Sequence, residues 1–556
     1  MAHLKQSGAV LLALACLGGS GQAWGRQNIV IGEISVGYDF QERSYDDNDV
    51  DTVRGRAVTT DGTTEAVVLT PGSDLNAADE GDTRSLFVTP RVRFSSRDVA
   101  DLFEFTYAPT FTYDEIDSSS DVGHDLQLLG ERYITKDWLV RATDSYFYGD
   151  DPQSDYQRQG EAIVSTTEAQ PDTQPVGAGP EEAAGRQLTD EYGRSKYWRN
   201  DFGLSTEYTY AQDSVVGIGY NYGVLRNVDD EGGGDYDDYD RHEATGRLSY
   251  RINTQWSAET ELAYVKGLYD ETEITEVRVT QPEPVEPANN DRDDSDEDSE
   301  REPEPAEPPE PIITSTTEGL NDDLVEYHGR LRVNYNWRPH DIFFGQYSYQ
   351  ETDYESPLEE DSVIHEGTLG WEHDFSNRLR MTLSGGPTLV TYDESPDETG
   401  YNAYAGLTYA FPQSLLSAHT SYNYEFDNFD GRRSGLSKVW RSEIGFTHQF
   451  SQAWQAAFIA GYEQSDHDEP YEDEIVVVLD GDSDATAIDL GAREGDHFSY
   501  REETWDAGLT VRYSFLRWYT ASLSYRYADY QSEVDQDYDE HRVMLTLTAA
   551  KEIFRW

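Results

Sequence analysis

The stretch "LRVNYNWRPHDIFFGQYSYQ", residues 331–350, alternates apolar or aromatic side chains with polar ones up to Trp337 and resumes the alternation after Asp341. Alternate side chains of a β-strand lie on the same face, so Leu331 and Trp337 share an apolar face opposite a polar one. Pro339 and its polar neighbours supply turn chemistry between the two runs. The stretch therefore predicts a β-hairpin with one apolar face.

In a soluble protein, a second sheet or a layer of helices would cover that apolar face. The composition of this chain supplies few hydrophobic residues for such a layer. Of 556 residues, 37% are hydrophobic and 27% are charged, and 109 acidic against 42 basic residues give a formal net charge of -67. Disordered acidic chains share such a charge but are poor in aromatic residues, whereas here 13% of residues are aromatic. The combination is typical of an all-β transmembrane barrel, whose apolar face meets lipid and whose other face meets water. The acidity also disfavours nucleic acid as a partner.

Alternating segments recur from 28–44 to 540–556 and predict a transmembrane antiparallel up-and-down β-barrel of about 20 strands, with 18 as the alternative. Connections after even-numbered strands are short, as at Gln212-Asp213 and Ser376-Asn377, and those after odd-numbered strands are longer and mostly acidic. Outer-membrane barrels have short periplasmic turns and long extracellular loops. We therefore expect a multi-pass protein of a Gram-negative outer membrane, with both termini in the periplasm and acidic loops outside the cell.

The first 25 residues have the features of a signal peptide. Lys5 precedes an apolar run at 9–17, and small residues follow up to an A-x-A-like cleavage site near residue 23 or 25. The barrel domain would then comprise residues 26–556. A lipoprotein interpretation would make Cys16 the lipidated residue, although Leu14 is larger than the residue that such signals favour. With ordinary cleavage, the chain keeps no thiol for a disulfide or a metal.

Two features at strand ends indicate membrane insertion. The chain closes on "MLTLTAAKEIFRW", in which Phe554 and the terminal Trp556 form the aromatic ending that the barrel assembly machinery reads. Tryptophans beside the short turns predict a periplasmic aromatic girdle, because amphipathic rings settle at the interface. They are Trp138, Trp256, Trp337, Trp454 and Trp518.

The last hairpin, "SYRYADYQSEVDQDYDEHRVMLTLTA" at 524–549, resembles that of a family of predicted outer-membrane porins associated with exopolysaccharide systems in proteobacteria. The resemblance is loose over the rest of the chain, and Lys551 and Glu552 depart from it by adding charges near the terminus. It implies a barrel, an outer-membrane location and an exopolysaccharide as a partner.

Two connections, 149–197 and 270–323, are much longer than ordinary loops and are expected to be extracellular. The second contains a Pro-rich acidic run, which favours an extended, disordered and solvated segment. The first has mixed composition and is the better candidate for a loop that folds into the barrel. The first strand begins almost at once after the expected cleavage site, which leaves no room for an amino-terminal plug domain.

Many arginines alternate with apolar residues on the predicted strands, and charged side chains on the lipid face would cost about 2–4 kcal/mol each. We therefore expect them to face the lumen together with acidic residues. Two interpretations stay open: the charges pair in cross-strand ladders that brace the wall, or they select solutes. The lumen candidates are Arg91, Arg93, Arg247, Arg251, Arg330, Arg332, Arg512, Arg526, Glu326 and Glu372.

Motifs for a cofactor are weak. Asp480, Asp482 and Asp484 alternate as in calcium loops, but no glutamate follows at the spacing of an EF-hand. A loose Ca²⁺ site that bridges to lipopolysaccharide phosphates is one interpretation, and a solvated acidic surface is the other. No cofactor is otherwise expected.

Three function classes follow. The first is a passive channel or porin-like pore for small solutes or an exported polysaccharide. The second is a structural or adhesive barrel that acts through acidic loops and divalent cations. An outer-membrane hydrolase is the third, and it would need Ser, His and an acid to converge near the rim. We do not expect an enzyme.

Overall fold

The structure is a computed structural model. It describes residues 26–45, 55–60, 63–68, 83–116, 118–149, 196–212, 214–228, 238–269, 272–280, 312–321, 323–356, 360–393, 396–429, 435–470, 476–480, 484–488, 497–532 and 537–556.

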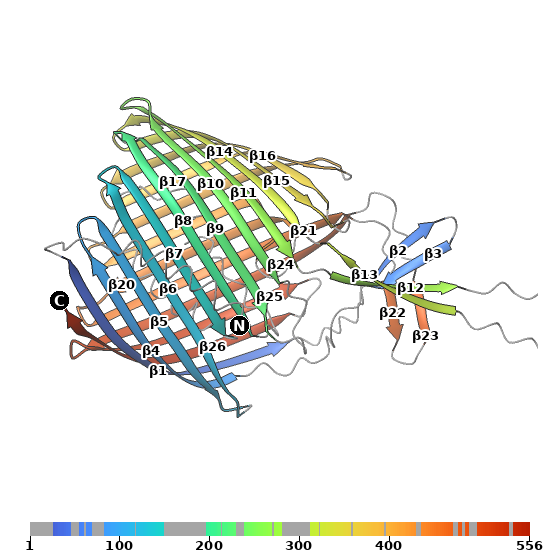
Figure 1. Ribbon diagram of the computed structural model, residues 1–556, viewed down its shortest axis with the longest axis horizontal. Coiled ribbons are helices and arrows are strands. Elements are labelled where there is room, and N and C mark those ends of the chain that lie inside the picture. Colours follow the sequence, from blue (N-terminus) through green and yellow to red (C-terminus); the bar gives the residue numbers. More distant parts are fainter. Residues whose placement is uncertain are drawn as a thin grey trace, which may run out of the picture.

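Twenty of the strands form one antiparallel sheet that closes on itself, because β1 pairs both with β4 and with the last strand, β26 (Figure 1). Strand order follows chain order around the barrel, so every neighbour is reached by an up-and-down connection. The barrel strands are β1 (Gln27–Tyr45), β4 (Thr83–Arg97), β5 (Asp101–Asp114), β6 (Ser120–Thr135), β7 (Trp138–Gly149), β8 (Tyr197–Ala211), β9 (Ser214–Asn227), β10 (Tyr239–Arg251), β11 (Trp256–Tyr269), β14 (Leu324–Arg338), β15 (Asp341–Tyr354), β16 (Ser362–Ser376), β17 (Leu379–Tyr392), β18 (Glu398–Ala410), β19 (Ser414–Asp427), β20 (Gly435–Gln449), β21 (Trp454–Pro470), β24 (His497–Phe515), β25 (Tyr519–Ser532) and β26 (Tyr538–Arg555).

The predicted fold class is therefore confirmed, with 20 strands rather than 18. The opening stretch forms β14 and β15, which meet at the turn that contains Pro339. Each of the 20 barrel strands has at least the roughly 9 to 11 residues that a tilted strand needs to cross a bilayer. In the described part of the chain, no helix is long and apolar enough to cross a membrane.

Short turns gather at one end of the barrel, which we call the short-turn end, and the opposite end is the long-loop end. The first and last strands of the barrel begin and finish at the short-turn end, respectively. There the backbones of Asn28 and Trp556 exchange two hydrogen bonds of 2.9 and 3.0 Å. The carboxyl terminus is marked there in Figure 1. The tryptophans beside the turns are 39 to 51% exposed, as an aromatic girdle requires: Trp138, Trp256, Trp337, Trp454 and Trp518.

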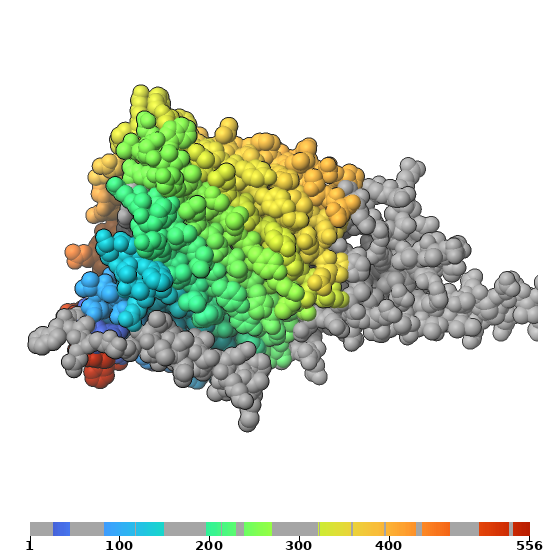
Figure 2. Space-filling model, turned by 45° about the horizontal axis from the view of Figure 1, so that its top comes forward, coloured from blue at the N-terminus to red at the C-terminus, as the bar shows by residue number. Residues whose placement is uncertain are grey.

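The outer face of the barrel carries exposed apolar side chains at every second position. On β26, Leu545 and Leu547 are about half exposed, and Ile34 and Val36 are exposed on the neighbouring β1. Figure 2 shows the continuous wall that the middle strands, coloured green and yellow, present on one side. An apolar face of this kind is stable against lipid rather than water.

Six short strands lie in the connections at the long-loop end and were not predicted from the alternation. β2 (Gly55–Thr60), β3 (Thr63–Val68), β12 (Thr272–Thr280) and β13 (Ile312–Leu320) form a four-stranded sheet in the order β13-β12-β3-β2, and β22 (Val476–Asp480) pairs with β23 (Asp484–Ile488). The connection 270–323 is thus paired near both its ends, on either side of the Pro-rich run that we expected to be extended and disordered. Its Pro-rich acidic run at 281–311 lies outside the described residues.

Candidate functional site: the inner face of the barrel

The inner face is identified by its alternation with the exposed apolar positions of each strand. On β14, Tyr327 and Leu331 are 41% and 45% exposed on the outer face. Glu326, Arg330 and Arg332 occupy the alternate positions and therefore point inward. The same reasoning holds around the barrel, so polar and charged side chains line its interior.

Several predicted lumen residues form ion pairs between strands. Arg91 donates to Glu33 across the β1–β4 pair at 3.1 Å. Arg330 of β14 lies 2.7 Å from Glu261 of β11. Arg332 reaches over β15 to Glu372 of β16 at 2.5 Å, and its guanidinium lies 3.8 Å from the Phe344 ring.

The remaining predicted arginines differ in their partners. Arg247 lies 4.0 Å from Glu207, and Arg251 donates to the backbone oxygen of Asn253 beside its turn. Arg526 lies opposite Arg542 in the β25–β26 register. Arg93 and Arg512 make no ion pair with any residue that the structure describes. The set therefore contains both wall-bracing pairs and charges that are open to a solute.

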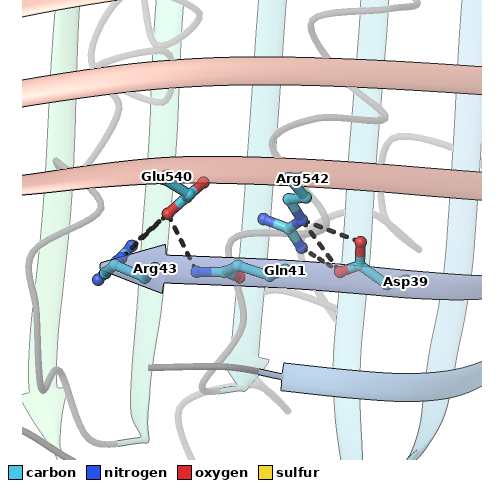
Figure 3. Close-up of polar contacts among 5 residues, drawn as sticks. All are labelled: Asp39, Gln41, Arg43, Glu540 and Arg542. Carbon is cyan, nitrogen blue, oxygen red and sulfur yellow. Dashed lines mark hydrogen bonds and ion pairs between the residues drawn. The ribbon is translucent and has the colours of Figure 1, made fainter. Parts of the chain in front are cut away.

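A cluster of buried charges joins the first and last strands (Figure 3). Arg542 of β26 donates from Nε and Nη2 to the Asp39 carboxylate of β1, with an Nη2–Oδ2 distance of 2.6 Å. Arg43 and Gln41 of β1 both donate to Oε2 of Glu540. Asp39 is 1% exposed, and the other charged members are at most 9% exposed. We call Asp39, Arg43, Glu540 and Arg542 the seam cluster.

The seam cluster was only partly visible in the sequence. Its partners are separated by 503 and 497 residues, so no local pattern links them. The register of β1 on β26, which places Arg43 opposite Glu540, brings them together. Only Arg526, across from Arg542, was among the predicted residues.

The described residues of the connection after β19, Asn428 and Phe429, lie in the mouth of the barrel at the long-loop end, and we call these two residues the loop. Asn428 donates from Nδ2 to Glu326 at 2.8 Å, and its side-chain oxygen accepts from the Tyr354 hydroxyl at 2.9 Å. The Asn428 backbone oxygen accepts from the Tyr269 hydroxyl. These partners lie on β11, β14 and β15, and β16, β17 and β18 separate them from β19 around the barrel. The loop therefore lies inside the barrel, against a distant part of the wall.

Phe429 anchors the loop in an aromatic cluster. Its ring lies 5.4 Å from Tyr239 and 6.0 Å from Tyr269, and the Arg241 guanidinium is 4.9 Å from it. Its backbone oxygen accepts from the Tyr239 hydroxyl at 2.8 Å. Phe429 is 6% exposed, and Leu225, Val265 and Leu324, which complete the base of the cluster, are 0% exposed. The aromatic contacts and the buried base fix this loop against the inner wall.

Gly267 leaves room for Phe429. A Cβ at this position would lie 2.9 Å from the Phe429 ring, which is closer than side chains tolerate. This loop was not predicted from the sequence, which favoured 149–197, and residues 150–195 of that connection lie outside the described residues. A seven-residue connection has no length signal, and an Asn-Phe pair does not reveal its distant partners.

Glu326, another predicted lumen residue, is 5% exposed and accepts from Asn428 on one side and contacts His328 Nε2 at 3.0 Å on the other. It therefore holds the loop rather than standing open in the lumen. The assembly-signal residues lie at the short-turn end, where Phe554 and Trp556 are 62% and 63% exposed. The Trp556 ring lies 6.3 Å from Phe94.

A serine, a histidine and a carboxylate do converge near the long-loop end. Ser437 Oγ is 2.8 Å from His467 Nδ1, and His467 Nε2 is 3.4 Å from Glu502. Ser437 is 3% exposed, so a substrate carbonyl has no approach to its oxygen. This group packs the wall and gives no support to hydrolysis.

Part of the expected calcium motif lies outside the described residues. Asp480 and Asp484 pair at the end of the β22–β23 hairpin, while Asp482 lies outside the described residues. Among the residues that the structure describes, no three His, Cys, Asp or Glu side chains are grouped to hold a metal ion.

A scan against family models finds no match, and a search of curated proteins also finds none. Among solved structures, the chain is similar to the siderophore receptor PirA from Pseudomonas aeruginosa, with 8% identity and a TM-score of 0.42 over 94% of this chain and 80% of that one. It is also similar to Acinetobacter baumannii OccAB4, with 10% identity and a TM-score of 0.36 over 94% and 98% of the chains. The Pseudomonas aeruginosa outer membrane protein opdK gives 8% identity and a TM-score of 0.36 over 94% and 99%. PirA is described as a siderophore receptor and opdK as an outer membrane protein, and likenesses with TM-scores this low carry no argument about this chain.

Proposed function

We propose that the chain is an outer-membrane channel that passes small polar solutes, or an exported polysaccharide, by passive diffusion. The observation that supports this most is a closed 20-strand barrel whose outer face is apolar and whose inner face is charged. Barrels of about 16 to 18 strands already leave an aqueous channel between their inner side chains. The exopolysaccharide rests only on the resemblance of the last hairpin.

The proposal includes a constriction at the long-loop end. The loop at Asn428 and Phe429 occupies part of the mouth, and Arg241 lies beside it. A solute that enters from this end passes the narrowed mouth and the partly exposed Arg241 before it reaches the arginines of the wall. Size and charge would both affect its passage.

Single-channel conductance in planar bilayers tests the channel. Wild-type protein should give discrete conductance steps, and a barrel that acts only as a structural or adhesive surface protein should give none. Absence of conductance from heat-modifiable, folded protein would contradict the proposal and favour that alternative.

The constriction is tested by unseating the loop. Phe429→Ala removes the aromatic anchor, and Gly267→Val places a side chain where the ring now packs. Both variants should raise single-channel conductance, because the loop no longer fills the mouth. Phe411→Ala, at an exposed position beside a short turn, is the matched control and should conduct like wild type. Unchanged conductance in both loop variants would show that the constriction lies elsewhere.

A further inference from the structure

Four histidines stand on the outer face at the same height near the long-loop end. His242, His365 and His541 each follow the first residue of β10, β16 and β26 by three positions, and His124 follows that of β6 by four. On these strands the exposed apolar residues include Val122, Leu248, Leu369 and Leu545, at even spacings from the histidines. The histidines therefore share the outer face with them.

Each histidine is held in the same way by a tyrosine of the preceding strand. The Tyr hydroxyl lies 2.7 to 3.0 Å from His Nδ1 in all four cases: Tyr107–His124, Tyr220–His242, Tyr347–His365 and Tyr525–His541. On three of them a second tyrosine, two residues after the first, packs its ring 4.9 to 5.3 Å from the imidazole: Tyr222, Tyr349 and Tyr527. We call these four units the Tyr–His ring.

The ring is regular around the barrel. β6, β10, β16, β20 and β26 are each four strands apart in the order of the sheet. β20 has Lys438 at the same position as the histidines, three residues after Gly435, and its Nζ is 6.0 Å from the Tyr424 ring and 2.7 Å from Glu398. A polar, nitrogen-bearing side chain thus recurs on every fourth strand.

The ring marks the edge of the apolar band. On β26, His541 and Lys551 are outward residues ten positions apart, and the outward positions between them are Val543, Leu545, Leu547 and Ala549. This spacing equals the roughly 9 to 11 residues with which a tilted strand crosses the hydrocarbon core. The Tyr–His ring therefore lies at the depth of the lipid headgroups on the long-loop side.

The donor and acceptor in these hydrogen bonds depend on the imidazole tautomer, and we assign the hydroxyl as the donor to Nδ1. This places the ring proton of a neutral imidazole on Nε2, and a protonated imidazole carries a proton there as well. Each unit then offers one Nε2–H donor at headgroup depth. Two of the nearby outward carboxylates are already engaged, since Asp240 pairs with Arg226 at 2.8 Å and Asp539 accepts from the Tyr527 hydroxyl at 2.8 Å. The strongest acceptors available to these donors in the headgroup layer are phosphate oxygens.

We propose that the Tyr–His ring is a set of binding sites for phosphorylated lipid headgroups, of the kind that lipid A presents in an outer leaflet. The four units are separate sites, because at least three strands lie between any two of their histidines. The proposal rests on the outer-membrane location proposed above, but it does not depend on whether the barrel conducts.

The test titrates purified full-length protein in detergent with bisphosphorylated lipid A and with its dephosphorylated form, and counts bound lipids by native mass spectrometry. The fourfold variant H124F/H242F/H365F/H541F keeps an aromatic ring at each site and removes the donor. It should bind the phosphorylated lipid at least about fivefold more weakly, the factor expected for losing one hydrogen bond per site. Its binding of the dephosphorylated lipid should stay that of wild type.

The control is His419→Phe, the same substitution on the inner face, where His419 lies opposite Glu443. It should leave lipid binding unaltered. If the fourfold variant does not fold, each single variant should lose one tightly bound phosphorylated lipid. Equal binding of phosphorylated lipid by wild type and variants would overturn the proposal. So would an equal loss for both forms of the lipid, because the sites would then recognise acyl chains.

Discussion

The seam cluster affects the stability of the barrel mainly when one partner of a buried ion pair is removed. Arg542 and Asp39 are 4% and 1% exposed, so neither charge recovers its lost hydration from solvent. Replacing both by apolar residues of similar size could be neutral, whereas removing one leaves a buried charge without its partner. The surface pair Arg141–Glu131 has a similar distance, 2.7 Å, but Arg141 is 46% exposed, and such pairs contribute little.

We therefore predict that Arg542→Ala lowers the free energy of unfolding by about 3–5 kcal/mol, because Asp39 stays buried without its partner. Arg141→Ala, the matched control, should change it by less than about 1 kcal/mol. Urea titrations of protein refolded in lipid vesicles, followed by tryptophan fluorescence and by heat-modifiable migration, measure both. An Arg542→Ala midpoint equal to that of the control would show that the seam cluster does not stabilise closure.

At the scale of elements, β16 and β17 approach each other very closely at one point. A Cβ on Gly386 would lie 1.7 Å from the backbone oxygen of Gly367, and the pairing of the two strands is interrupted between Glu366 and Leu369 without a change of register. Backbone atoms cannot move aside as a flexible side chain can. Gly386 is therefore required by this approach, and not by a turn.

Gly386→Ala should separate β16 from β17 and reduce the fraction of protein that folds into vesicles, with a loss of stability of about 1–3 kcal/mol from the forced backbone shift. Gly246→Ala on β10 is the control, because a Cβ there meets nothing within 4 Å. Heat-modifiable migration gives the folded fraction of each variant. Similar folding of the two would mean that the strands adjust without cost.

Elements of the barrel could be predicted from the sequence because their signal is local. Period-two alternation such as Leu331 to Trp337 sets the strand and its faces, and short turns such as 339–340 set where it reverses. The seam cluster and the loop at Phe429 could not be predicted this way. Their partners are brought together by closure of the whole barrel, and neither Asn428 nor Arg43 has a neighbour in sequence that reveals its partner.

The Tyr–His ring could be predicted from the sequence only in part. Its sequence signal is the repeated Tyr-x-Tyr at 220–222, 347–349 and 525–527, each followed on the next strand by a histidine near its start. The signal becomes readable only when the strands are aligned by height, which the register supplies. A strand-by-strand alignment of alternating segments could therefore find such rings without a structure.

At the scale of the whole molecule, assembly of the barrel should depend on the aromatic terminus. Trp556 is 63% exposed at the short-turn end, so its removal deletes little packing. Deleting Trp556 should therefore lower the amount of protein inserted in the membrane of cells while leaving refolding into pure lipid vesicles nearly unchanged. Equal losses in both settings would show that Trp556 is needed for stability and not for recognition by the assembly machinery.

The chain's net charge of -67 is concentrated in part in residues 281–311, which hold 13 acidic and two basic residues. If this run lies outside the membrane near the mouth, its potential raises the local concentration of cations within a Debye length, roughly 10 Å at 0.1 M salt. Its deletion should leave folding unchanged, since the 20 strands of the barrel all lie in other parts of the sequence. Cation preference, measured as a reversal potential across a salt gradient, should fall at low ionic strength and change little at 1 M salt, where screening already removes the effect. A conductance that changes several-fold at high salt would instead place this run inside the pore, because only a physical obstruction survives screening.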